Sequence, residues 1–427
     1  MRPTSEKAKS ASKVSSRSHL GERVPRLRFP GFKGEWEVFR IKDILSLSDG
    51  DWIESEDQSP SGIRLVQTGN IGEGEFKDHL ERARFISETT FHRLHCSEIF
   101  PGDCLISRLP DPIGRACVVP ESCYRMITAV DCAIARPRNT KFDIRFFVFI
   151  SGTPQYKKQM QLSITGSTRP RISRAFLDDV RISLPKVSEQ SKIIEFLSLL
   201  DDCIAAQRKL VELLKKHKRG LSNALFSGKL RLVNDAKWKV YRLGDIVRRV
   251  TRKNGTASDV PLTISAQHGL IDQREFFSKS VASADMSGYY LLKQGEFAYN
   301  RSSSGDCPFG SIKRLERYAQ GAVSTLYICF EAIGDSDDSE FLKWYFDSFA
   351  WHREVGMICA EGARNHGLLN VPTEGFFDTK HLLPSDKEER KKMAMFMALE
   401  AARCERIECE LARLTELKSG FLQQMFA

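Results

Sequence analysis

The sequence predicts an α+β protein that uses one plan twice: a strand-rich globular domain followed by a long helix, then the same pair again. Three observations predict this. The phrase GEWEVFRIKDIL at 34–45 returns as AKWKVYRLGDIV at 236–247, which places Trp36 and Trp238 in equivalent positions. Short apolar runs separated by Gly, Pro and Asn fill both halves and are typical of strands. Each half then ends in a long segment of helical periodicity, at 188–226 and 387–426.

Length and composition favour a soluble protein of more than one domain. The chain has 427 residues, of which 41% are hydrophobic and 28% charged. Its apolar runs are shorter than the roughly 18 residues of a membrane span, and FFVFI at 146–150 indicates a buried strand or helix. The first twenty residues are rich in Ser and basic side chains, which predicts a disordered tail in a cytoplasmic protein; a transit peptide is the less favoured alternative.

Cysteine usage and charge narrow the class further. The eleven cysteines form no CxxC pair, so we expect reduced, mostly buried thiols and no disulfide framework. His92, His95 and Cys96 lie close together but have no second ligand pair, and we therefore predict no metal. The formal net charge of +10 favours an acidic partner, with nucleic acid as the leading candidate.

The repeat continues between these landmarks and sets the domain boundaries. TGNIGEGEF at 68–76 matches AQHGLIDQREF at 266–276, and FPGDCLISR at 100–108 matches KQGEFAYNR at 293–301. The order is kept while the spacing drifts, as expected when loops gain and lose residues. We predict these boundaries: a tail at 1–20, a first domain at 21–185, a long helix at 186–228, a second domain at 229–384 and a second long helix at 385–427.

Both long segments carry apolar residues at alternating spacings of four and three, which predicts a seam between two helices. In the first segment the seam is interrupted by Gln207 and Lys218, and in the second by Glu400 and Lys418. Two such helices can bury their seams on each other as a left-handed coiled coil about 57 Å long. The alternative is that each helix packs only on its own domain. The apolar seam positions are Ile193, Leu197, Leu200, Ile204, Val211, Leu214, Leu221 and Leu225, then Met393, Met397, Cys404, Ile407, Leu411, Leu414, Phe421 and Met425.

This arrangement resembles the DNA specificity subunits of type I restriction-modification enzymes. The resemblance rests on PRLRFPGFKGEWEVFRIKDI (25–44), on the segment 184–231, on QGEFAYNRSSSGDCPFGSIKRLERYAQGAVSTLYICF (294–330) and on LKSGFLQQMF (417–426). It implies two target recognition domains that read the halves of an asymmetric, bipartite site in double-stranded DNA, and two long helices that pack antiparallel. The second helix departs from the pattern at Glu400 and Cys404, where we expect a weaker seam.

The resemblance also implies partners, and it implies no chemistry for this chain itself. Two modification (methyltransferase) subunits would bring S-adenosylmethionine, and restriction subunits would bring ATP and Mg²⁺, so we expect no cofactor here. The motifs agree: DPIG at 111–114 lacks the second proline and aromatic residue of a methyltransferase motif, and SGKL at 227–230 lacks the upstream glycine of a phosphate-binding loop. A noncatalytic specificity subunit is therefore the leading hypothesis. A coiled-coil adaptor for protein partners is the second, and a self-sufficient methyltransferase the third.

Candidate DNA contacts are polar side chains on the Gly-rich turns and on the loops that precede the long helices, because Arg and Lys bind phosphates while Arg, Asn, Gln and Ser read base edges. For a single arginine the alternative is a solvated surface side chain, and for an asparagine it is a turn cap. The candidates are Gln67, Asn70, Arg108, Arg115, Arg169, Arg171 and Arg174 in the first half, and Gln267, His268, Asn300, Arg301, Ser303, Arg364, Asn365 and His366 in the second.

Overall fold

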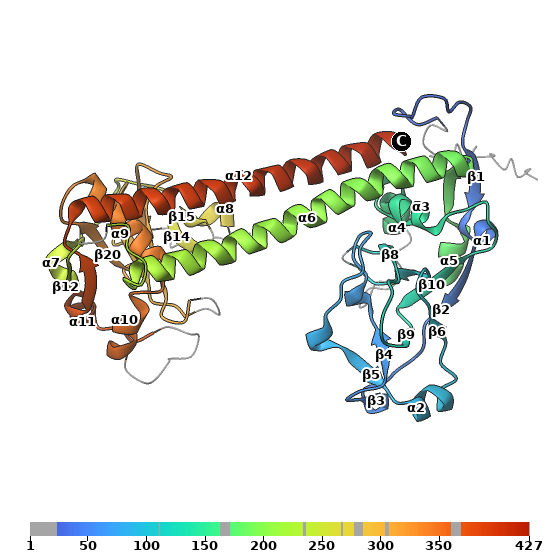
Figure 1. The fold of residues 1–427 in the computed structure, drawn as a ribbon, viewed down its shortest axis with the longest axis horizontal. Helices are drawn as coiled ribbons and strands as arrows, with labels where there is room; N and C mark the ends of the chain where they lie inside the picture. The colour runs from blue at the N-terminus through green and yellow to red at the C-terminus, as the bar shows by residue number, and fades with distance from the viewer. Residues whose placement is uncertain are drawn as a thin grey trace, which may run out of the picture. The chain divides into compact units, whose positions relative to one another are not determined.

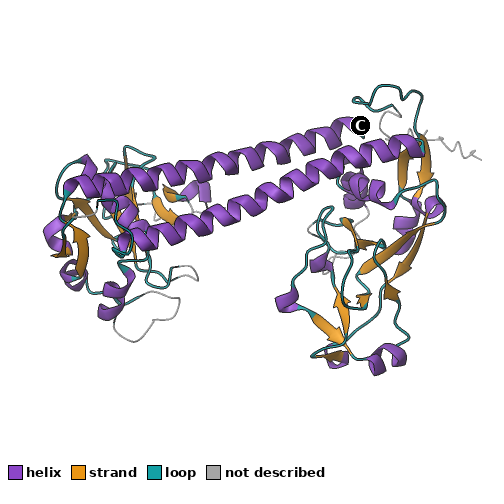
Figure 2. Ribbon diagram, in the orientation of Figure 1, coloured by secondary structure: helices purple, strands orange, loops and turns teal. Residues whose placement is uncertain are grey.

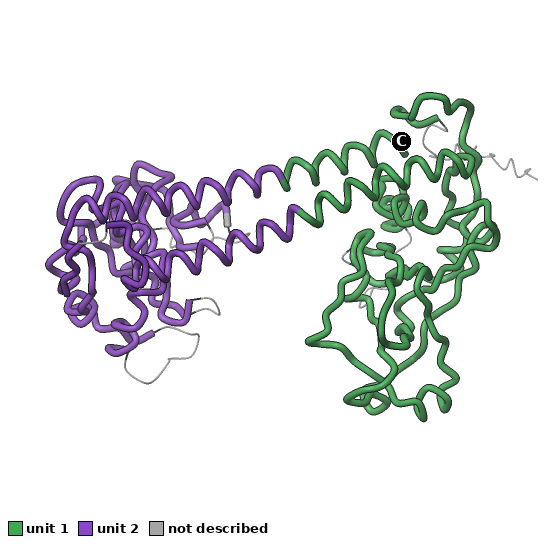
Figure 3. The backbone as a smooth tube through the Cα atoms, in the orientation of Figure 1, with its two compact units in different colours: residues 1–206, 411–427 green, residues 207–410 purple. Residues whose placement is uncertain are grey.

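The structure is a computed structural model (Figure 1). It describes residues 24–110, 112–162, 171–233, 236–265, 268–276, 285–303, 307–359 and 369–426, and the tail predicted at 1–20 lies outside these ranges. The chain divides into two compact units: unit 1 comprises residues 1–206 and 411–427, and unit 2 comprises residues 207–410 (Figure 3). Each unit therefore contains one predicted domain together with parts of both long helices.

Unit 1 is built on a four-stranded antiparallel sheet of order β2-β10-β7-β8. Its strands are β2 (Leu45–Asp49), β7 (Cys104–Ser107), β8 (Ala116–Val118) and β10 (Cys132–Pro137). A second, two-stranded sheet pairs β1 (Glu37–Arg40) with β11 (Arg181–Leu184). These two sheets are accompanied by the helices α1 (Ile41–Ile44), α3 (Ile144–Ser151), α4 (Pro154–Leu162) and α5 (Arg174–Asp179). We call the two sheets and these helices the framework of the unit. FFVFI forms most of α3 and is buried, so the helical alternative for that segment is correct.

A further sheet of five strands belongs to unit 1, with the order β3-β5-β4-β9-β6. It contains one parallel pair, β4 with β9. Its strands and the short helices around it are β3 (Gln58–Ser59), β4 (Ile63–Val66), β5 (Arg84–Ile86), β6 (Glu98–Ile99) and β9 (Met126–Thr128), with η1 (Ser55–Asp57), η2 (Thr68–Asn70), η3 (Leu80–Arg82) and α2 (Glu88–Arg93).

Unit 2 repeats the framework of unit 1 in the same order. Its four-stranded sheet has the order β13-β20-β17-β18, and β12 pairs with β21 as β1 pairs with β11. The elements are β12 (Trp238–Arg242), β13 (Val247–Arg249), β17 (Phe297–Asn300), β18 (Ser311–Arg314), β20 (Ile328–Ala332) and β21 (Lys380–Pro384), with α7 (Leu243–Ile246), α9 (Ser336–Asp347), α10 (His352–Ile358) and α11 (Thr373–Asp378). This order confirms the predicted internal repeat.

The two units differ in their smaller sheets. In place of the five-stranded sheet, unit 2 has the hairpin of β14 (Leu262–Ser265) and β15 (Gly269–Asp272), followed by α8 (Gln273–Phe276). A separate antiparallel pair joins β16 (Tyr290–Lys293) to β19 (Gln320–Val323). The framework is thus shared by the two halves, whereas the smaller sheets differ between them.

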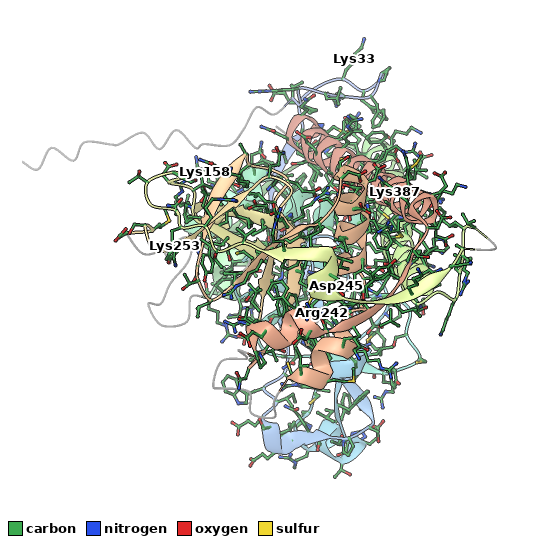
Figure 4. The ribbon with its side chains drawn as sticks, turned by 90° about the vertical axis from the view of Figure 1, so that its left-hand side faces the viewer. Lys33, Lys158, Arg242, Asp245, Lys253 and Lys387 are labelled. Carbon is green, nitrogen blue, oxygen red and sulfur yellow. The ribbon has the colours of Figure 1, made fainter. Side chains whose placement is uncertain are left out.

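Even an exposed ion pair of the framework occurs twice. In unit 1 the guanidinium of Arg40 lies 3.3 Å from the carboxylate of Asp179. In unit 2 Arg242 lies 3.0 Å from Asp378 and 3.4 Å from Asp245, and Figure 4 labels Arg242 and Asp245 side by side. Arg40 and Arg242 each end the first strand of their unit, and Asp179 and Asp378 each end the short helix before its last strand. The equivalence of the two units therefore extends to single side chains.

The long helices are α6 (Val187–Phe226) and α12 (Lys387–Met425), drawn in purple in Figure 2. Within unit 1, Phe196 of α6 packs on Phe421 of α12 with ring centroids 4.9 Å apart. Within unit 2, the side-chain amide of Gln207 donates to the backbone oxygen of Ile407 at 3.3 Å. The start of α6 thus lies beside the end of α12, and the middles of the two helices lie side by side, which confirms the antiparallel pair. The apolar seam positions are all buried or half-buried.

The ends of the long helices also enter the cores of the units. Ile193 and Leu197 of α6 join the core of unit 1 together with Met425 of α12. Met393 and Met397 of α12 join the core of unit 2. The alternative considered for the helices, packing of each on its own domain, therefore describes only their starts, because Met425 at the end of α12 joins the core of the other domain.

The cysteines of the chain form no disulfide bond in this structure. All eleven cysteines are free, and six of them are buried. Within the described ranges, no helix combines the length and apolar character needed to cross a bilayer. Nor does any group of three or more His, Cys, Asp and Glu side chains in those ranges gather as metal ligands.

Candidate nucleic-acid interface

The first candidate, the TGN turn of unit 1, forms the single-turn helix η2, and Asn70 holds it in shape. The side-chain oxygen of Asn70 accepts a hydrogen bond from the backbone N–H of Gln67 at 3.0 Å. Its side-chain amide donates to the backbone oxygen of Lys77 at 2.9 Å. Asn70 therefore acts as the turn cap that was the alternative to base reading.

Arg115 ties this turn to the loop that follows β7. Its Nη2 donates to the backbone oxygen of Thr68 at 2.8 Å and its Nε to that of Ile71 at 2.6 Å. Its Nη1 donates to the backbone oxygen of Pro112 at 2.9 Å. With its donors directed at backbone carbonyls, the guanidinium positions two loops side by side.

A cavity of about 300 Å³ opens beside the turn, and arginines surround it. Arg64 is buried and forms an ion pair with Asp78. Arg82 and Arg84 are exposed, and neither side chain forms a hydrogen bond or ion pair with any other part of the described chain. Free guanidinium groups at a concave surface are suited to binding phosphate groups. The other lining residues include Gln67, Thr68, Gly69, Asn70, His79, Leu109, Ala129 and Asp131.

Sequence reasoning missed Arg82 and Arg84. The segment HLERARF at 79–85 contains neither glycine nor proline and resembles an ordinary charged surface. The signal that could have found them is the position of the segment just after the TGN turn, since a strand returning beside that turn brings its basic residues to the same face.

Three candidate arginines converge on Asp49 and the loop before β10. Arg108 is buried; its Nε donates to the backbone oxygen of Ile172 at 2.9 Å and its Nη1 to Asp49 at 2.7 Å. Burial lowers the pKa of the Arg108 guanidinium. Arg174 reaches the other oxygen of Asp49 at 3.1 Å and is about half exposed. Arg171 lies 3.1 Å from Asp131 and donates to the backbone oxygen of Val130.

Arg301 is the counterpart of Arg108 in unit 2. Its Nη1 donates to the backbone oxygen of Val371 at 3.1 Å and its Nη2 to that of Leu326 at 2.9 Å. The side-chain oxygen of Asn300 accepts from the backbone N–H of Ser302 at 3.1 Å, so Asn300 also caps a turn. Both arginines thus join the strand that carries them to the segment ahead of the long helix.

The charge around these two arginines differs between the units. Asp49, Asp131 and Arg174 of unit 1 have uncharged counterparts, judged by their positions relative to β2, β10 and α5. These counterparts are Thr251, Leu326 and Thr373. One framework therefore presents a charged cluster in unit 1 and uncharged side chains in unit 2.

The remaining candidates are scattered or lie outside the described residues. His268 is exposed in the β14–β15 turn, where its backbone N–H donates to the Ser265 hydroxyl at 3.3 Å, and Ser303 is exposed after β17. The structure brings neither into contact with Arg301 through a hydrogen bond within the described ranges. Five candidates lie outside those ranges: Arg169, Gln267, Arg364, Asn365 and His366.

Two described residues occupy equivalent places beside Arg108 and Arg301. The backbone N–H of Ile172 donates to the oxygen of Arg108 at 3.1 Å, and that of Leu369 donates to the oxygen of Arg301 at 2.8 Å. The bond between the arginine and the segment before the last short helix is therefore repeated in the two units.

Comparison by sequence finds relatives of one kind. Residues 33–216 match the family described as the type I restriction modification DNA specificity domain. The chain is 23% identical over 208 residues to the type I restriction enzyme MjaVIII specificity subunit of Methanocaldococcus jannaschii, covering 47% of each chain. It is 21% identical over 161 residues to a putative type I specificity subunit of Mycoplasma pneumoniae, covering 37% of this chain and 41% of the other. The matches thus span about half the length of these relatives.

Comparison by structure covers nearly the whole chain. The S subunit of a type I restriction-modification system from M. genitalium aligns with a TM-score of 0.53 and 14% identity, over 95% of this chain and 99% of the other. A chain from a study of complex assembly and conformational transition in the type I R-M system aligns with a TM-score of 0.56 and 14% identity, over 92% and 97%. At this identity the likeness concerns the fold.

Proposed function

We propose that this chain is the noncatalytic specificity subunit of a type I restriction-modification complex, because residues 33–216 match the type I restriction modification DNA specificity domain. The match confirms the resemblance inferred from the sequence. In this proposal each unit reads one half of an asymmetric, bipartite sequence in double-stranded DNA. The observation that carries it is the repeated framework whose two copies present different polar groups around Arg108 and Arg301.

The DNA-facing residues of unit 1 are proposed to be those with free or half-exposed side chains. Arg82 and Arg84 beside the cavity and Arg174 beside Asp49 are suited to phosphate contacts. Arg108, Arg115 and Arg301 instead serve the framework, since their donors are directed at backbone oxygens and Asp49. Arg169 and the candidates at 364–366 remain proposed base readers.

The partners are proposed to be two modification subunits and, with them, restriction subunits. A chain with an internal twofold repeat offers two equivalent surfaces to two copies of one partner. Leu199 of α6 and Leu399 of α12 support this: they are equivalent in sequence, and 60% and 68% of their surfaces are exposed. S-adenosylmethionine, ATP and Mg²⁺ are assigned to these partners, and the reaction to which this chain gives sequence specificity is adenine methylation.

Co-expression with the genomically adjacent methyltransferase tests the proposal. Methylated adenines in host DNA would be mapped by single-molecule sequencing, with and without this gene. We expect a bipartite motif with a fixed gap that disappears when the gene is deleted. Unchanged methylation, together with a complex that still forms, would favour the coiled-coil adaptor.

Arginine variants test the proposed surface within that complex. Replacing both Arg82 and Arg84 by alanine should weaken binding to motif-containing and unrelated duplexes alike, and should reduce the salt dependence of log K by about one unit for each phosphate that the variant no longer binds. Arg40→Ala is the matched control, because Arg40 is an exposed arginine that pairs with Asp179 on the framework. Equal effects of the control and the double variant would contradict the assignment of the surface.

A further inference from the structure

Trp52 is an exposed indole in a chain that buries most of its other tryptophans. The sequence contains five tryptophans, and all five lie within the described ranges. Trp36, Trp344 and Trp351 are buried and Trp238 is half-buried, whereas 66% of Trp52 is exposed. Because burial of an indole is favourable, an indole with 66% of its surface exposed is a candidate for contact with a partner.

The backbone that carries Trp52 is fixed by several close contacts. The backbone N–H of Asp51 donates to the oxygen of Thr128 at 2.8 Å, and its oxygen accepts from Val130 at 2.9 Å. The carboxylate of Asp51 accepts from the backbone N–H of Ser97 at 2.9 Å. A Cβ on Gly50 would lie 2.4 Å from the oxygen of Ala129, so only glycine permits this approach. The exposure of Trp52 is therefore imposed by the fold and is not a loose loop end.

Trp52 stands next to the arginine cluster of unit 1. It is three residues after Asp49, which binds Arg108 and Arg174. The residue before it pairs with Ala129, which lines the cavity flanked by Arg82 and Arg84. The indole is oriented by a hydrogen bond from its Nε1 to the carboxylate of Glu54 at 3.1 Å. An aromatic ring whose backbone neighbours line a cavity flanked by arginines can contact bases while the arginines hold phosphates.

The counterpart of this position in unit 2 has the opposite character. Asn254 is only 4% exposed. Its side-chain amide donates to the backbone oxygen of Ser258 at 2.9 Å, and its side-chain oxygen accepts from the N–H of Ser258 at 3.1 Å. The residue before it, Lys253, packs its ammonium 4.6 Å from the ring centre of Tyr290 and is labelled in Figure 4. The framework therefore does not require an exposed aromatic residue here.

We propose that Trp52 is a DNA-contact residue of unit 1 that places its indole against the bases of the half-site, while the neighbouring arginines bind the flanking phosphates. This rests on the proposed function and adds to it an apolar contact that unit 2 lacks at the equivalent position. Small apolar wedges and stacked rings contribute to DNA affinity through their contact with base faces and edges.

The test measures acrylamide quenching of tryptophan fluorescence in the wild-type complex with its methyltransferase and in the Trp52→Phe complex. The difference between the two isolates Trp52, whatever tryptophans the partner adds. The probe is a duplex containing the motif found by methylation mapping. We expect Trp52 to be readily quenched without DNA and protected once the duplex is bound.

Each other result has a distinct meaning. Quenching that is unchanged while the duplex is bound would overturn the role of Trp52 and leave the specificity function intact. An indole already shielded before DNA is added would assign Trp52 to a protein contact and also overturn the inference. A wild-type complex that binds no duplex would instead refute the proposed function.

Affinity measurements give a second readout. Trp52→Ala should weaken binding of the motif duplex by about tenfold or more, and Trp52→Phe should retain most of the affinity because an apolar ring can still contact the bases. Phe100→Ala is the matched control: Phe100 is an exposed ring of the same unit that contacts Arg136, which is paired with Asp103. An equal loss in Phe100→Ala would show a nonspecific effect and would contradict the proposal.

Discussion

At the scale of single residues, His381 is an ionisable group held neutral inside unit 2. Its Nδ1 lies 2.7 Å from the hydroxyl of Tyr345 and its Nε2 lies 2.8 Å from that of Thr379. Burial lowers the pKa of His381 to about 4, because the charged imidazolium would lose its hydration. Ile182 occupies the matching place on β11 of unit 1.

We predict that this histidine makes the stability of unit 2 sensitive to mild acid. The pKa of His381 in the folded chain lies below the value of about 6.5 in an unfolded chain, so the unfolded state takes up its proton first. The contribution is complete above about pH 6.5 and falls towards pH 4, by on the order of 1 kcal/mol per pH unit. Urea unfolding at pH 7, 6 and 5 measures it, and His381→Gln should make the trend less steep; the remainder belongs in part to His352, whose pKa burial also lowers to about 4. An equally steep loss in that variant would contradict the assignment.

For single residues, sequence reasoning was least able to separate a DNA contact from a structural role. Arg108 and Arg174 look alike in sequence, but one is buried and the other half exposed. What distinguishes them is pairing across the chain: Arg108 bonds to Ile172, 64 positions away. A local motif does not specify such a partner, and the same limit hid Trp52, whose exposure depends on the approach of Gly50 to Ala129.

At the scale of elements, the long helices place two equivalent lysines in different surroundings. Lys418 of α12 forms an ion pair with Asp201 of α6 within unit 1, and its ammonium lies 5.8 Å from the ring centre of Phe149. Lys218 of α6 lies 5.3 Å from the ring of Trp344 within unit 2. Ala401 is the sequence counterpart of Asp201, so the repeat offers Lys218 no equivalent carboxylate. Lys218 forms no ion pair within the described ranges.

We predict that Lys418→Met costs more stability than Lys218→Met. Both variants keep the length of the side chain and lose the interaction of an ammonium with a ring, but only the first leaves a half-exposed carboxylate without its partner. The difference in free energy of unfolding should be about 1 kcal/mol. Chemical denaturation of the two variants measures it. Equal losses would show that the pair with Asp201 contributes nothing to the coiled coil.

The helices and the framework are the elements that the sequence predicts best. Alternating spacings of four and three over Ile193 to Leu225 identify both a helix and its buried face, because both follow from local periodicity. The five-stranded sheet of unit 1 could not be predicted in the same way. Its strands β3 and β6 have two residues each, and β4 pairs in parallel with the distant β9. Such pairing depends on the folded chain and leaves no periodic pattern.

At the scale of the whole chain, the repeat is circular: a segment near the start of the sequence contacts the end of α12 as the segment after α6 contacts the end of α6. Within unit 2 the backbone N–H of Leu230 donates to the oxygen of Ala224 at 2.9 Å, just after α6 ends. Within unit 1 the N–H of Leu27 donates to the oxygen of Gln424 at 3.0 Å, near the end of α12. Leu27 thus docks on α12 as Leu230 docks on α6, although Leu27 and Gln424 come from opposite ends of the sequence. Phe29 and Trp36 extend the contact by packing on Phe196 and Phe426.

We predict that a circular permutant, opened between Gly228 and Lys229 and fused from Ala427 to Val24, will fold and keep the DNA target. The fusion places four residues, 427 and 24–26, between Phe426 and Leu27. In the natural connection three residues, 227–229, lie between Phe226 and Leu230. No added linker is needed, because the hydrogen bond from Leu27 to Gln424 already brings the joined segments together. Thermal unfolding and methylation mapping in the complex measure the outcome. A permutant of equal length opened within α6, between Ala206 and Gln207, is the control and should lose the fold. If both permutants fail alike, the docking of Leu27 does not substitute for a covalent connection.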